Sequence, residues 1–492
     1  MILSIDQGTT GTTAVVFDSS GHLLGRSYSE IPNYYPQPGW VEQDAEEIWS
    51  VTLRVCAAAL QRAGIRVSDI TAVGITNQRE TTILWDRYTG EPVFPAIVWQ
   101  CRRSAEVCRE LAELGRSDWL RERSGLLLDA YFSASKLAWL FRHNPDLLTR
   151  ARNGDLCFGT VDSWLIWKMS GGKAHLTDHT NASRTLLYNL NDRAWDKELL
   201  TLFQCPESIL PQILPSAGYF TDTDPHAFLG TAVPICGVAG DQQAALFGQG
   251  CTEPGSIKNT YGTGCFMLAF AGEERPELPQ GLLATAACDA QGNPAYAVEG
   301  SVFTAGSAIQ WLRDEMGMIQ RAVDTEIIAQ SIPHTRGVYL VPAFNGLGAP
   351  HWDSSARGTI CGLSRGAGRA EIVRATLESI AYQSDELARL MEQALGLPIT
   401  HMRVDGGACA NNFLMQFQAD ISSLRIERPG QIESTAIGAA LLAGIGSGVW
   451  QPQGLPECLQ QIERDFMPAM PIAERQQLLT GWRRAVKACR TF

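Results

Sequence analysis

Residues 6–13, with the sequence DQGTTGTT, have the composition of a loop that binds a polyphosphate. Gly8 and Gly11 permit a tight turn with exposed backbone amides, and the threonines add hydroxyl donors. Asp6 supplies a carboxylate that could hold a metal ion beside the phosphates. Taken alone, an ordinary hairpin turn explains these residues better. The chain contains no GxxxxGK[ST] sequence, so the common phosphate-binding loop is excluded.

Two further glycine-containing segments could complete a nucleotide site. Residues 258–264 (KNTYGTG) again place Gly and Thr at the end of a predicted strand, so this loop and the first could hold phosphates from two sides. Residues 404–412 (VDGGACANN) predict a strand that turns through two glycines into a helix. Backbone without side chains there lets a flat ring approach, and Asn411 can hydrogen-bond it. Each segment alone is equally compatible with a plain turn.

Charged side chains mark two other segments, the start of a predicted helix and the end of a predicted strand. Asp241 opens residues 240–248 (GDQQAALFG), where the cap of a helix is the simpler role for an isolated Asp. Arg79 and Glu80 could bind hydroxyl groups, while Trp99 could cover a short carbon chain. Without further support, a surface ion pair and a core tryptophan explain these three residues better.

Alternating strands and helices must position these segments. The first predicted helix begins at the N-cap Asp44 and ends at Gly64. The strand over 70–76 brings Arg79 and Glu80 to its carboxyl end, the edge of an open α/β sheet where ligands usually bind. The other strands predicted in the first part of the chain cover residues 2–5, 14–17 and 23–28.

The second half of the chain repeats this alternation. Apolar strands are predicted over 338–342 and 402–404, and a long helix over 370–394. Such a pattern predicts two α/β lobes. Gly and Pro cluster near residue 250, so the division is predicted there, with lobes of residues 1–250 and 251–492.

The composition is that of a globular protein, with 45% hydrophobic and 19% charged residues. At 492 residues the chain is long enough for two or three domains. Its net charge of -12 argues against a nucleic-acid partner, because such binding depends on clustered Lys and Arg.

The cysteines and the apolar segments bear on the compartment. The thirteen cysteines include no Cys-x-x-Cys pair, so reduced thiols are expected rather than disulfides or a zinc module. Residues 1–6 run directly into a strand pattern, which predicts no secretory signal. No run of about 18 apolar residues occurs, which predicts no membrane span. The cytoplasm is therefore the expected compartment.

In their order and spacing, these segments resemble the FGGY family of carbohydrate kinases over nearly the whole chain. Residues 131–140 (YFSASKLAWL) are similar to the first signature of that family, and residues 362–366 (GLSRG) with 374–378 (RATLE) to the second. Three further segments resemble the glycerol-phosphorylating branch of the family: residues 77–82 (NQRETT), 99–103 (WQCRR) and 240–243 (GDQQ).

This resemblance implies a fold and an activity. The fold would consist of two ribonuclease-H-like lobes of the actin and hexokinase type, with the active site in the cleft between them. The activity would be ATP-dependent phosphorylation of glycerol to sn-glycerol 3-phosphate with Mg²⁺, which feeds glycerol catabolism and lipid precursor supply. The protein would act as a homodimer or homotetramer.

The resemblance also implies roles for individual residues. Asp241 would be the general base and, with Asp6, would position Mg²⁺. The glycerol pocket would be formed by Arg79, Glu80, Trp99, Tyr131, Asp241, Gln242 and Phe266. The phosphates of ATP would be contacted by Thr9, Thr10, Gly11 and Thr263. The nucleoside end would be contacted by Gly306, Gln310, Gly407 and Asn411.

The sequence departs from many members of the family in three places. Thr13, counted with the ATP contacts, stands where an Arg is common, so one phosphate-directed charge is missing. Residues 221–233 lack the glycine- and lysine-rich loop by which some bacterial members bind an inhibitory sugar bisphosphate. His226 lacks the Tyr-His-Phe context of a histidine that the sugar phosphotransferase system phosphorylates in one bacterial subgroup.

The sequence is compatible with two alternative functions. A kinase for another polyol or a ketose would share the chemistry but would need different residues at Arg79, Glu80 and Trp99. A non-catalytic, actin-like protein would hold ATP without transferring its phosphoryl group. The presence of both Asp6 and Asp241 argues against the second alternative, because nucleotide binding alone needs no base beside a polyol pocket.

Overall fold

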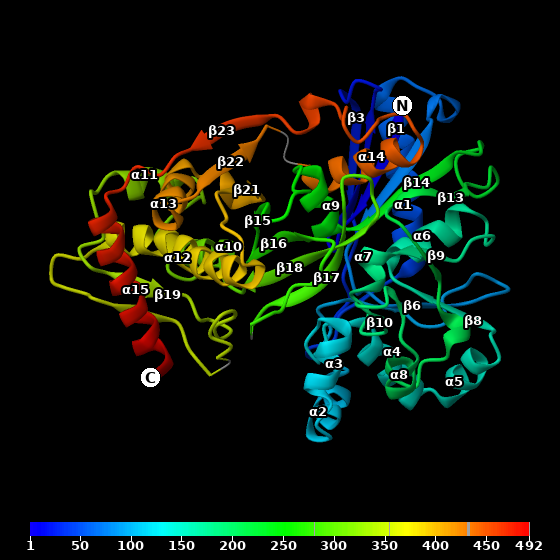
Figure 1. Ribbon diagram of the computed structural model, residues 1–492, viewed down its shortest axis with the longest axis horizontal. Helices are drawn as coiled ribbons and strands as arrows, with labels where there is room; N and C mark the ends of the chain where they lie inside the picture. Colours follow the sequence, from blue (N-terminus) through cyan, green and yellow to red (C-terminus); the bar gives the residue numbers. More distant parts are fainter. Residues whose placement is uncertain (280, 354, 431–432, 492) are drawn as a thin grey trace.

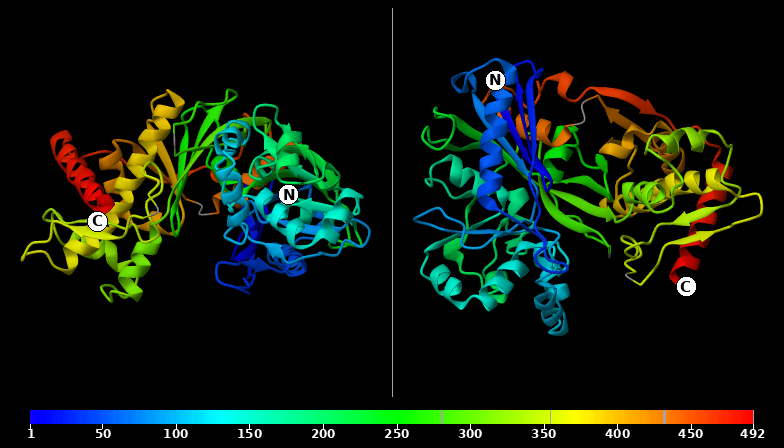
Figure 2. Two further views of the ribbon diagram at one scale, coloured as in Figure 1. Left: turned by 90° about the horizontal axis from the view of Figure 1, so that it is seen from below. Right: turned by 180° about the vertical axis from the view of Figure 1, so that it is seen from behind.

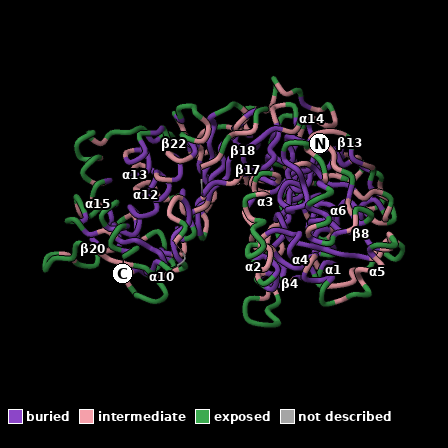
Figure 3. The backbone as a smooth tube through the Cα atoms, turned by 60° about the horizontal axis from the view of Figure 1, so that its bottom comes forward, coloured by how far each residue is buried: buried purple, intermediate pink, exposed green. Residues whose placement is uncertain are grey.

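The computed structural model describes residues 1–279, 281–353, 355–430 and 433–491, and it consists of two α/β lobes side by side (Figure 1). The N-terminus lies in one lobe and the C-terminus in the other, as the views from below and from behind also show (Figure 2). Buried backbone fills the interior of both lobes and continues through β17 (Leu283–Cys288) and β18 (Pro294–Val302), where the lobes meet (Figure 3).

The first lobe is built on a six-stranded mixed sheet in the order β13-β14-β5-β1-β2-β3. Strands β1, β2 and β3 form an antiparallel meander, and β5 and then β14 join β1 in parallel. The strands are β1 (Ile2–Gln7), β2 (Gly11–Phe17), β3 (Leu23–Glu30), β5 (Ala72–Asn77), β13 (Ala217–Asp222) and β14 (Pro234–Gly240). The four strands predicted in this part of the chain are therefore confirmed.

The second lobe contains a seven-stranded sheet in the order β17-β18-β16-β15-β21-β22-β23. Its centre repeats the first sheet, because β15, β16 and β18 are antiparallel neighbours while β21 and β22 follow β15 in parallel. The remaining strands are β15 (Ile257–Tyr261), β16 (Cys265–Gly272), β21 (His401–Asp405), β22 (Arg425–Pro429) and β23 (Ile462–Phe466). This shared order, three antiparallel strands followed by two parallel ones, confirms two ribonuclease-H-like lobes.

Long helices cover the sheets at the places that the sequence predicts. Helix α1 (Ala45–Ala63) begins after Asp44, whose side chain accepts a hydrogen bond from the Glu46 amide at 2.8 Å, and it ends at Gly64. It packs on β2 and β3. Helix α12 (Arg369–Leu395) packs on β16 and β18 and confirms the predicted helix over 370–394. Further helices are α6 (Val161–Met169), α13 (Asn412–Ser422) and α15 (Ile472–Thr491).

The predicted strand over 338–342 exists but lies outside the main sheet. Strand β19 (Tyr339–Val341) pairs only with β20 (Thr359–Cys361), as a separate two-stranded sheet. It packs against α12 and α15, and its Leu340 and Val341 are buried there. An apolar run shows that a strand is buried but does not specify the sheet in which it is buried.

Smaller elements surround the two sheets. Most of the smaller elements of the first lobe lie in the lower part of that lobe as it is drawn in Figure 1. The short helices are α2 (Ala105–Glu113), α3 (Ser117–Ser124), α4 (Ser133–His143), α5 (Pro145–Arg152), α7 (His179–Ala182), α8 (Lys197–Leu202), α10 (Gly306–Asp314) and α11 (Asp324–Gln330). The short strands pair as β4 (Glu42–Gln43) with β7 (Ala96–Ile97), β6 (Ile83–Asp86) with β8 (Leu156–Gly159), β9 (Leu176–Asp178) with β12 (Gln212–Leu214), and β10 (Tyr188–Asn189) with β11 (Ala194–Trp195).

Two helices cross between the lobes. Helix α9 (Asp241–Gly248) follows the first sheet but packs on the second, where Leu246 meets Leu268 and Phe270. Helix α14 (Ser434–Gly446) comes from the second half of the chain but packs on the first sheet, with Leu441 in its core. A division of the chain at residue 250 remains a prediction, because α14 lies on the lobe formed by the first half.

Within the described ranges, no helix is long and apolar enough to cross a membrane. Among the described residues the thirteen cysteines form no disulfide bonds, and most of them are buried.

Candidate active site

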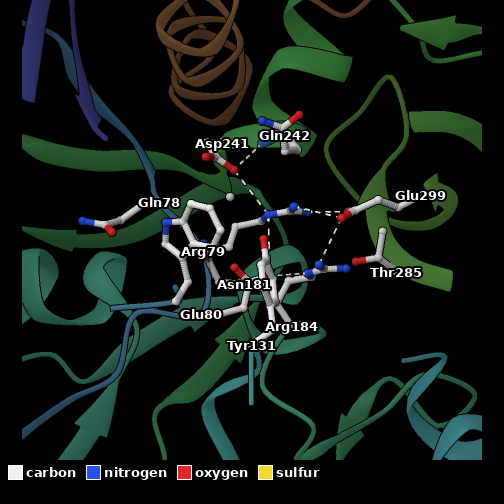
Figure 4. Close-up of polar contacts among 12 residues, drawn as sticks. Gln78, Arg79, Glu80, Tyr131, Asn181, Arg184, Asp241, Gln242, Thr285 and Glu299 are labelled. Carbon is white, nitrogen blue, oxygen red and sulfur yellow. Dashed lines mark hydrogen bonds and ion pairs between the residues drawn. The ribbon is translucent and has the colours of Figure 1, made fainter. Parts of the chain in front are cut away.

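Arg79 lies at the centre of a buried group of charged side chains between the lobes (Figure 4). It follows β5, at the carboxyl end of that strand, as the sequence predicts. Its Nη1 and Nη2 donate to the two carboxylate oxygens of Glu299, at 2.6 and 3.0 Å. Its Nε lies 3.3 Å from Oδ1 of Asp241. Burial alone would lower the pKa of Arg79, but Glu299, Glu80 and Asp241 raise it well above its usual value, so the guanidinium is charged.

Glu80 adopts a backbone conformation that non-glycine residues rarely adopt, with φ of 60°. Such a conformation costs on the order of 1 to 3 kcal/mol and persists where neighbouring contacts enforce it. Ser133 Oγ donates to the Glu80 carbonyl at 3.0 Å, and Arg184 Nε donates to its carboxylate at 2.6 Å. Burial raises the pKa of Glu80, and Arg184 and Arg79 oppose that rise. Hydrogen bonds to both the backbone carbonyl and the carboxylate therefore hold Glu80 in this conformation.

Asp241 is the first residue of α9, and among the described residues only one of its carboxylate oxygens has a partner. Its Oδ1 accepts a hydrogen bond from the Gln242 amide at 2.7 Å and also faces Arg79. Its Oδ2 accepts no hydrogen bond from the residues that the structure describes. The side chain is 30% exposed, and burial raises its pKa while Arg79 opposes that rise. The alternative role as helix cap is wrong, because Gly240 holds the N-cap position.

Two aromatic rings supply an apolar wall. The rings of Trp99 and Tyr131 lie 5.2 Å apart at an angle of 59°. Neither is fully buried, so Trp99 is not a simple core residue. Its indole Nε1 donates to Thr9 Oγ1 at 2.8 Å, which connects this wall to the first phosphate-binding loop.

Gln242 and Phe266 face the same region from two different elements. Gln242 Oε1 accepts a hydrogen bond from the buried Lys258 Nζ at 2.5 Å, which directs the amide NH₂ of Gln242 away from the lysine. Burial lowers the pKa of Lys258, while Asp405 and Asp241 raise it. In the second sheet, Lys258 pairs with Leu268 and Leu268 with Glu299, two residues along from Phe266. Phe266 therefore shares a sheet face with Lys258 and Glu299, because paired residues and residues two apart point the same way.

The first predicted phosphate loop is the turn between β1 and β2. Thr9 and Thr10 lie in this turn, and Gly11 begins β2. Thr13 lies further along β2, directly opposite Asp6 of β1. Burial raises the pKa of Asp6 to about 7, a hydrogen bond from Thr435 opposes the rise, and the nearby charge of Asp241 adds to it.

The second predicted phosphate loop packs against the start of α10. The Thr263 turn joins β15 and β16, and the Gly306 amide donates to the Gly262 carbonyl at 2.9 Å. A Cβ at Gly306 would lie 2.5 Å from that carbonyl oxygen, so only glycine allows this approach. Gln310 is exposed one turn further along α10. The structure thus places Gly306 against Gly262, and the neighbouring amides of Ala305 and Ser307 donate to the Thr263 carbonyl.

The predicted nucleoside contacts Gly407 and Asn411 lie beyond β21. Gly407 is exposed, and a Cβ added to it would meet no described atom within 4 Å. The polar atoms of Asn411 are already engaged, because Oδ1 accepts from the Leu414 amide at 3.0 Å and Nδ2 donates to Thr325 Oγ1 at 3.1 Å. In the described part of the chain, no hydrogen bond joins Asn411 to the Thr263 turn.

The carboxylates present fit a magnesium ion that arrives with a nucleotide. Mg²⁺ is usually held by one or two carboxylates together with substrate phosphates and water. Asp6 and Asp241 are close enough for the charge of Asp241 to raise the pKa of Asp6, so a cation between them would relieve their repulsion. The described residues contain no group of three or more metal-binding side chains, so the remaining ligands would come from the nucleotide and water.

Sequence reasoning missed three charged residues of this site: Arg184, Lys258 and Glu299. Glu299 is the only charged residue in the strand sequence PAYAVEGSV of β18. A lone acid in an apolar strand is a signal for a buried, paired charge. The same reasoning applies to Lys258 in β15, but neither pattern specifies the partner.

Comparisons with known proteins agree with this geometry. The profile described as "FGGY family of carbohydrate kinases, N-terminal domain" matches residues 1–248, and that of the C-terminal domain matches residues 257–447. The chain is 53% identical over 489 residues to a protein named glycerol kinase from Symbiobacterium thermophilum, covering 99% of this chain and 98% of that protein. It is 51% identical over 491 residues to a glycerol kinase from Bacillus licheniformis, covering 100% and 99%.

A solved structure supports the same assignment. The crystal structure of Plasmodium falciparum glycerol kinase with ADP matches this fold with a TM-score of 0.93 at 34% identity, covering 99% of this chain and 98% of that chain. Family profiles match both halves, and the sequence similarity extends over the whole length. The chain belongs to the FGGY family of carbohydrate kinases.

Proposed function

We propose that this chain transfers the terminal phosphoryl group of ATP to a primary hydroxyl of glycerol, with sn-glycerol 3-phosphate as the product that feeds glycerol catabolism and lipid precursor supply. The similarity to proteins named glycerol kinase supports this assignment. The single observation that carries it is the Asp241 carboxylate, which lies partly exposed beside Arg79 and whose Oδ2 accepts no hydrogen bond from the described residues.

The chemistry of the pocket suits glycerol. This substrate has three hydroxyls on a short carbon chain, so its site needs convergent polar groups and one apolar wall. Arg79 and the amide NH₂ of Gln242 would donate to the hydroxyls, and Asp241 would accept from one of them. Trp99 and Tyr131 would cover the carbon chain, with Phe266 facing them from the second sheet.

Asp241 would act on the hydroxyl that attacks. Its free Oδ2 would take the hydroxyl proton as the oxygen forms a bond to the terminal phosphorus of ATP and the bond from that phosphorus to the ADP oxygen breaks. Oδ1 accepts a hydrogen bond from the Gln242 amide and lies 3.3 Å from Arg79 Nε, which restrains the orientation of the carboxylate. Asp6 and Asp241 would hold Mg²⁺, which neutralises charge on the phosphates when it is bound.

We propose the other ligand contacts on the same basis. Thr9, Thr10 and Gly11 of the first turn and Thr263 of the second would contact the phosphates. Thr13 lies on β2, opposite Asp6 of β1, rather than in the turn, so it would contact the nucleotide close to the proposed metal ion. The nucleoside would lie near the exposed residues Gln310 and Gly407, with Gly306 and Asn411 shaping the backbone around it.

We also propose the cytoplasm as the location and a homodimer or homotetramer as the assembly. Mostly buried cysteines that form no disulfide bonds within the described residues are typical of proteins from reducing compartments, which supports the location. The assembly is inferred from the family alone. Light scattering coupled to size-exclusion chromatography measures it directly.

One assay tests the central proposal. The purified chain is given Mg-ATP and one of glycerol, dihydroxyacetone, xylulose or gluconate, and ADP release is measured. Glycerol should give the highest kcat/KM of the four acceptors. ADP release with glycerol no faster than in the blank would exclude the proposal, and a preference for another acceptor would assign the chain to a different branch of the family.

A further inference from the structure

Glu299 lies between two arginines that come from the other lobe (Figure 4). Its carboxylate accepts two hydrogen bonds from Arg79 and a third from Arg184 Nη2, at 3.0 Å. The side chain is 5% exposed, and the two arginines are exposed by 2% and 1%. Burial alone would raise the pKa of Glu299, but Arg184 and Arg79 lower it to about 2, so the carboxylate is charged.

The hydrogen bonds to Glu299 determine which edge of the Arg79 guanidinium is available. A guanidinium has five N–H groups in one plane. In Arg79, the Nη1 and Nη2 end is used by Glu299, and Nη1 also donates to Gln243 Oε1 at 3.2 Å. The edge formed by Nε and the second Nη2 hydrogen donates to none of the described residues. That edge faces Asp241 and Glu80, where the proposed glycerol hydroxyls would bind.

Arg184 extends the same arrangement to Glu80. Its Nε donates to Glu80 Oε1 while its Nη2 donates to Glu299 Oε1. Its guanidinium carbon also lies 5.1 Å from the ring of Phe132, next to Tyr131. Glu299 thus contacts Arg79 directly and Glu80 through one intermediate side chain.

The two lobes meet at this carboxylate. Glu299 belongs to β18 of the second sheet, whereas Arg79 and Arg184 belong to the first lobe. Next to it, Gln243 Nε2 donates to Thr285 Oγ1 at 3.1 Å, and Ser183 Oγ lies 3.0 Å from the same hydroxyl. A displacement of the second sheet would therefore move the plane of the Arg79 guanidinium.

We infer that Glu299 is a positioning residue for glycerol: from the second lobe it aligns the free edge of Arg79 with Asp241, and through Arg184 it holds Glu80. The inference rests on the proposed function. Glu299 does not touch the substrate. A role of this kind affects glycerol binding and leaves ATP binding nearly unchanged, whereas a purely structural role affects stability alone.

The experiment compares Glu299→Gln, Glu299→Asp and Arg79→Ala with the double variant Arg79→Ala/Glu299→Gln. The matched control is Glu378→Gln, which removes another buried carboxylate of the second lobe, paired with Arg374 Nε at 2.7 Å in α12. For each protein, kcat, KM for glycerol and KM for ATP are measured, and folding is checked by circular dichroism and thermal unfolding.

In Glu299→Gln, the KM for glycerol should rise by up to roughly 10- to 150-fold, the range for a lost charged hydrogen bond, while the KM for ATP changes less than about 2-fold. Glu299→Asp keeps the charge but is one methylene shorter, so the KM for glycerol should rise less than in Glu299→Gln. This variant still tests the inference if Glu299→Gln does not fold. Because Glu299 acts mainly through Arg79, the double variant should differ from Arg79→Ala by less than about 3-fold. The control should keep the wild-type KM for glycerol.

Three results would overturn the inference, and the first can be told apart from the other two. If the wild-type chain releases no ADP with glycerol, the proposed function fails and the inference fails with it. If the wild type is active but both Glu299 variants keep its KM for glycerol, or if the effects of Arg79→Ala and Glu299→Gln simply multiply, the inference alone is wrong.

Discussion

Asp241 Oδ1 lies 3.3 Å from Arg79 Nε because the two residues follow neighbouring parallel strands. Strands β14 and β5 pair in parallel with Gly240 opposite Asn77, so both chains leave the sheet at the same edge. The residues that follow must meet there. This contact connects the proposed base to the proposed hydroxyl-binding cation.

Replacing Asp241 by Asn should lower kcat with little effect on folding. The change removes the proton acceptor but keeps the shape of the side chain, and general-base contributions are on the order of 100- to 10,000-fold. The rate at saturating glycerol and ATP measures this effect, with thermal unfolding as the test of folding. The exposed Asp192→Asn is a matched control that should keep wild-type turnover. Near-native turnover of Asp241→Asn would remove Asp241 from the chemistry.

Replacing Arg79 by Ala should mainly raise the KM for glycerol. Loss of a hydrogen bond from a charged group costs roughly 1.5 to 3 kcal/mol, which corresponds to a rise of about 10- to 150-fold. Steady-state kinetics with varied glycerol measures it. As a control, Arg109→Ala removes an exposed arginine that pairs with Glu106 on α2, and it should change neither constant. An unchanged KM for glycerol in Arg79→Ala would place Arg79 outside the substrate site.

Asp6→Asn should raise the Mg²⁺ concentration needed for half-maximal activity. Asp6 would be one of only two carboxylates on the metal, so its loss removes one negative charge from the site. Titration of Mg²⁺ at fixed ATP measures the effect, and chelation of Mg²⁺ should abolish turnover in the wild type. The same half-maximal concentration in wild type and variant would show that Asp6 does not contribute to metal binding.

Gly438→Ala should destabilise the contact between the two crossing helices. A Cβ at Gly438 would lie 1.8 Å from the carbonyl oxygen of Ala244 in α9, so one helix must move. Overpacking of this kind typically costs about 1 to 3 kcal/mol of the free energy of unfolding. Because Asp241 begins α9, turnover should fall as well.

Chemical denaturation and the glycerol assay measure both effects of Gly438→Ala. Gly454→Ala is the control, because a Cβ there meets no atom within 4 Å. If Gly438→Ala were as stable and as active as Gly454→Ala, the close approach of α9 and α14 would not be needed for function.

We expect no response to fructose bisphosphate or to the phosphocarrier protein with phosphoenolpyruvate. Residues 221–233 contain no Lys or Arg to offset the desolvation of a bisphosphate. Asp224 in this segment is already paired with Lys173, at 2.7 Å. His226 is exposed, but its segment lacks the sequence context for phosphorylation.

Activity should therefore stay flat in both titrations, and His226→Ala should behave as the wild type. Inhibition by millimolar bisphosphate, or an activation that is lost in His226→Ala, would contradict this expectation.

Much of the fold and part of the site could be predicted because the signals are local. The cap at Asp44 and the glycine at 64 determine the ends of α1, and the period of the apolar residues determines its buried face. To predict that Arg79 follows a buried strand, it was enough to locate the end of that strand in the sequence. The similarity to known sequence segments then supplied the expected roles.

Only the tertiary structure decided the partners of the buried charges and the places where distant segments pack. The lone acid in β18 predicts a paired charge, yet its partners Arg79 and Arg184 lie in the other lobe. Likewise, the apolar pattern of α14 predicts burial but does not specify that the first sheet covers it. The physical reason is that burial and charge neutralisation require only that some partner be present, whereas the path of the whole chain determines which partner it is.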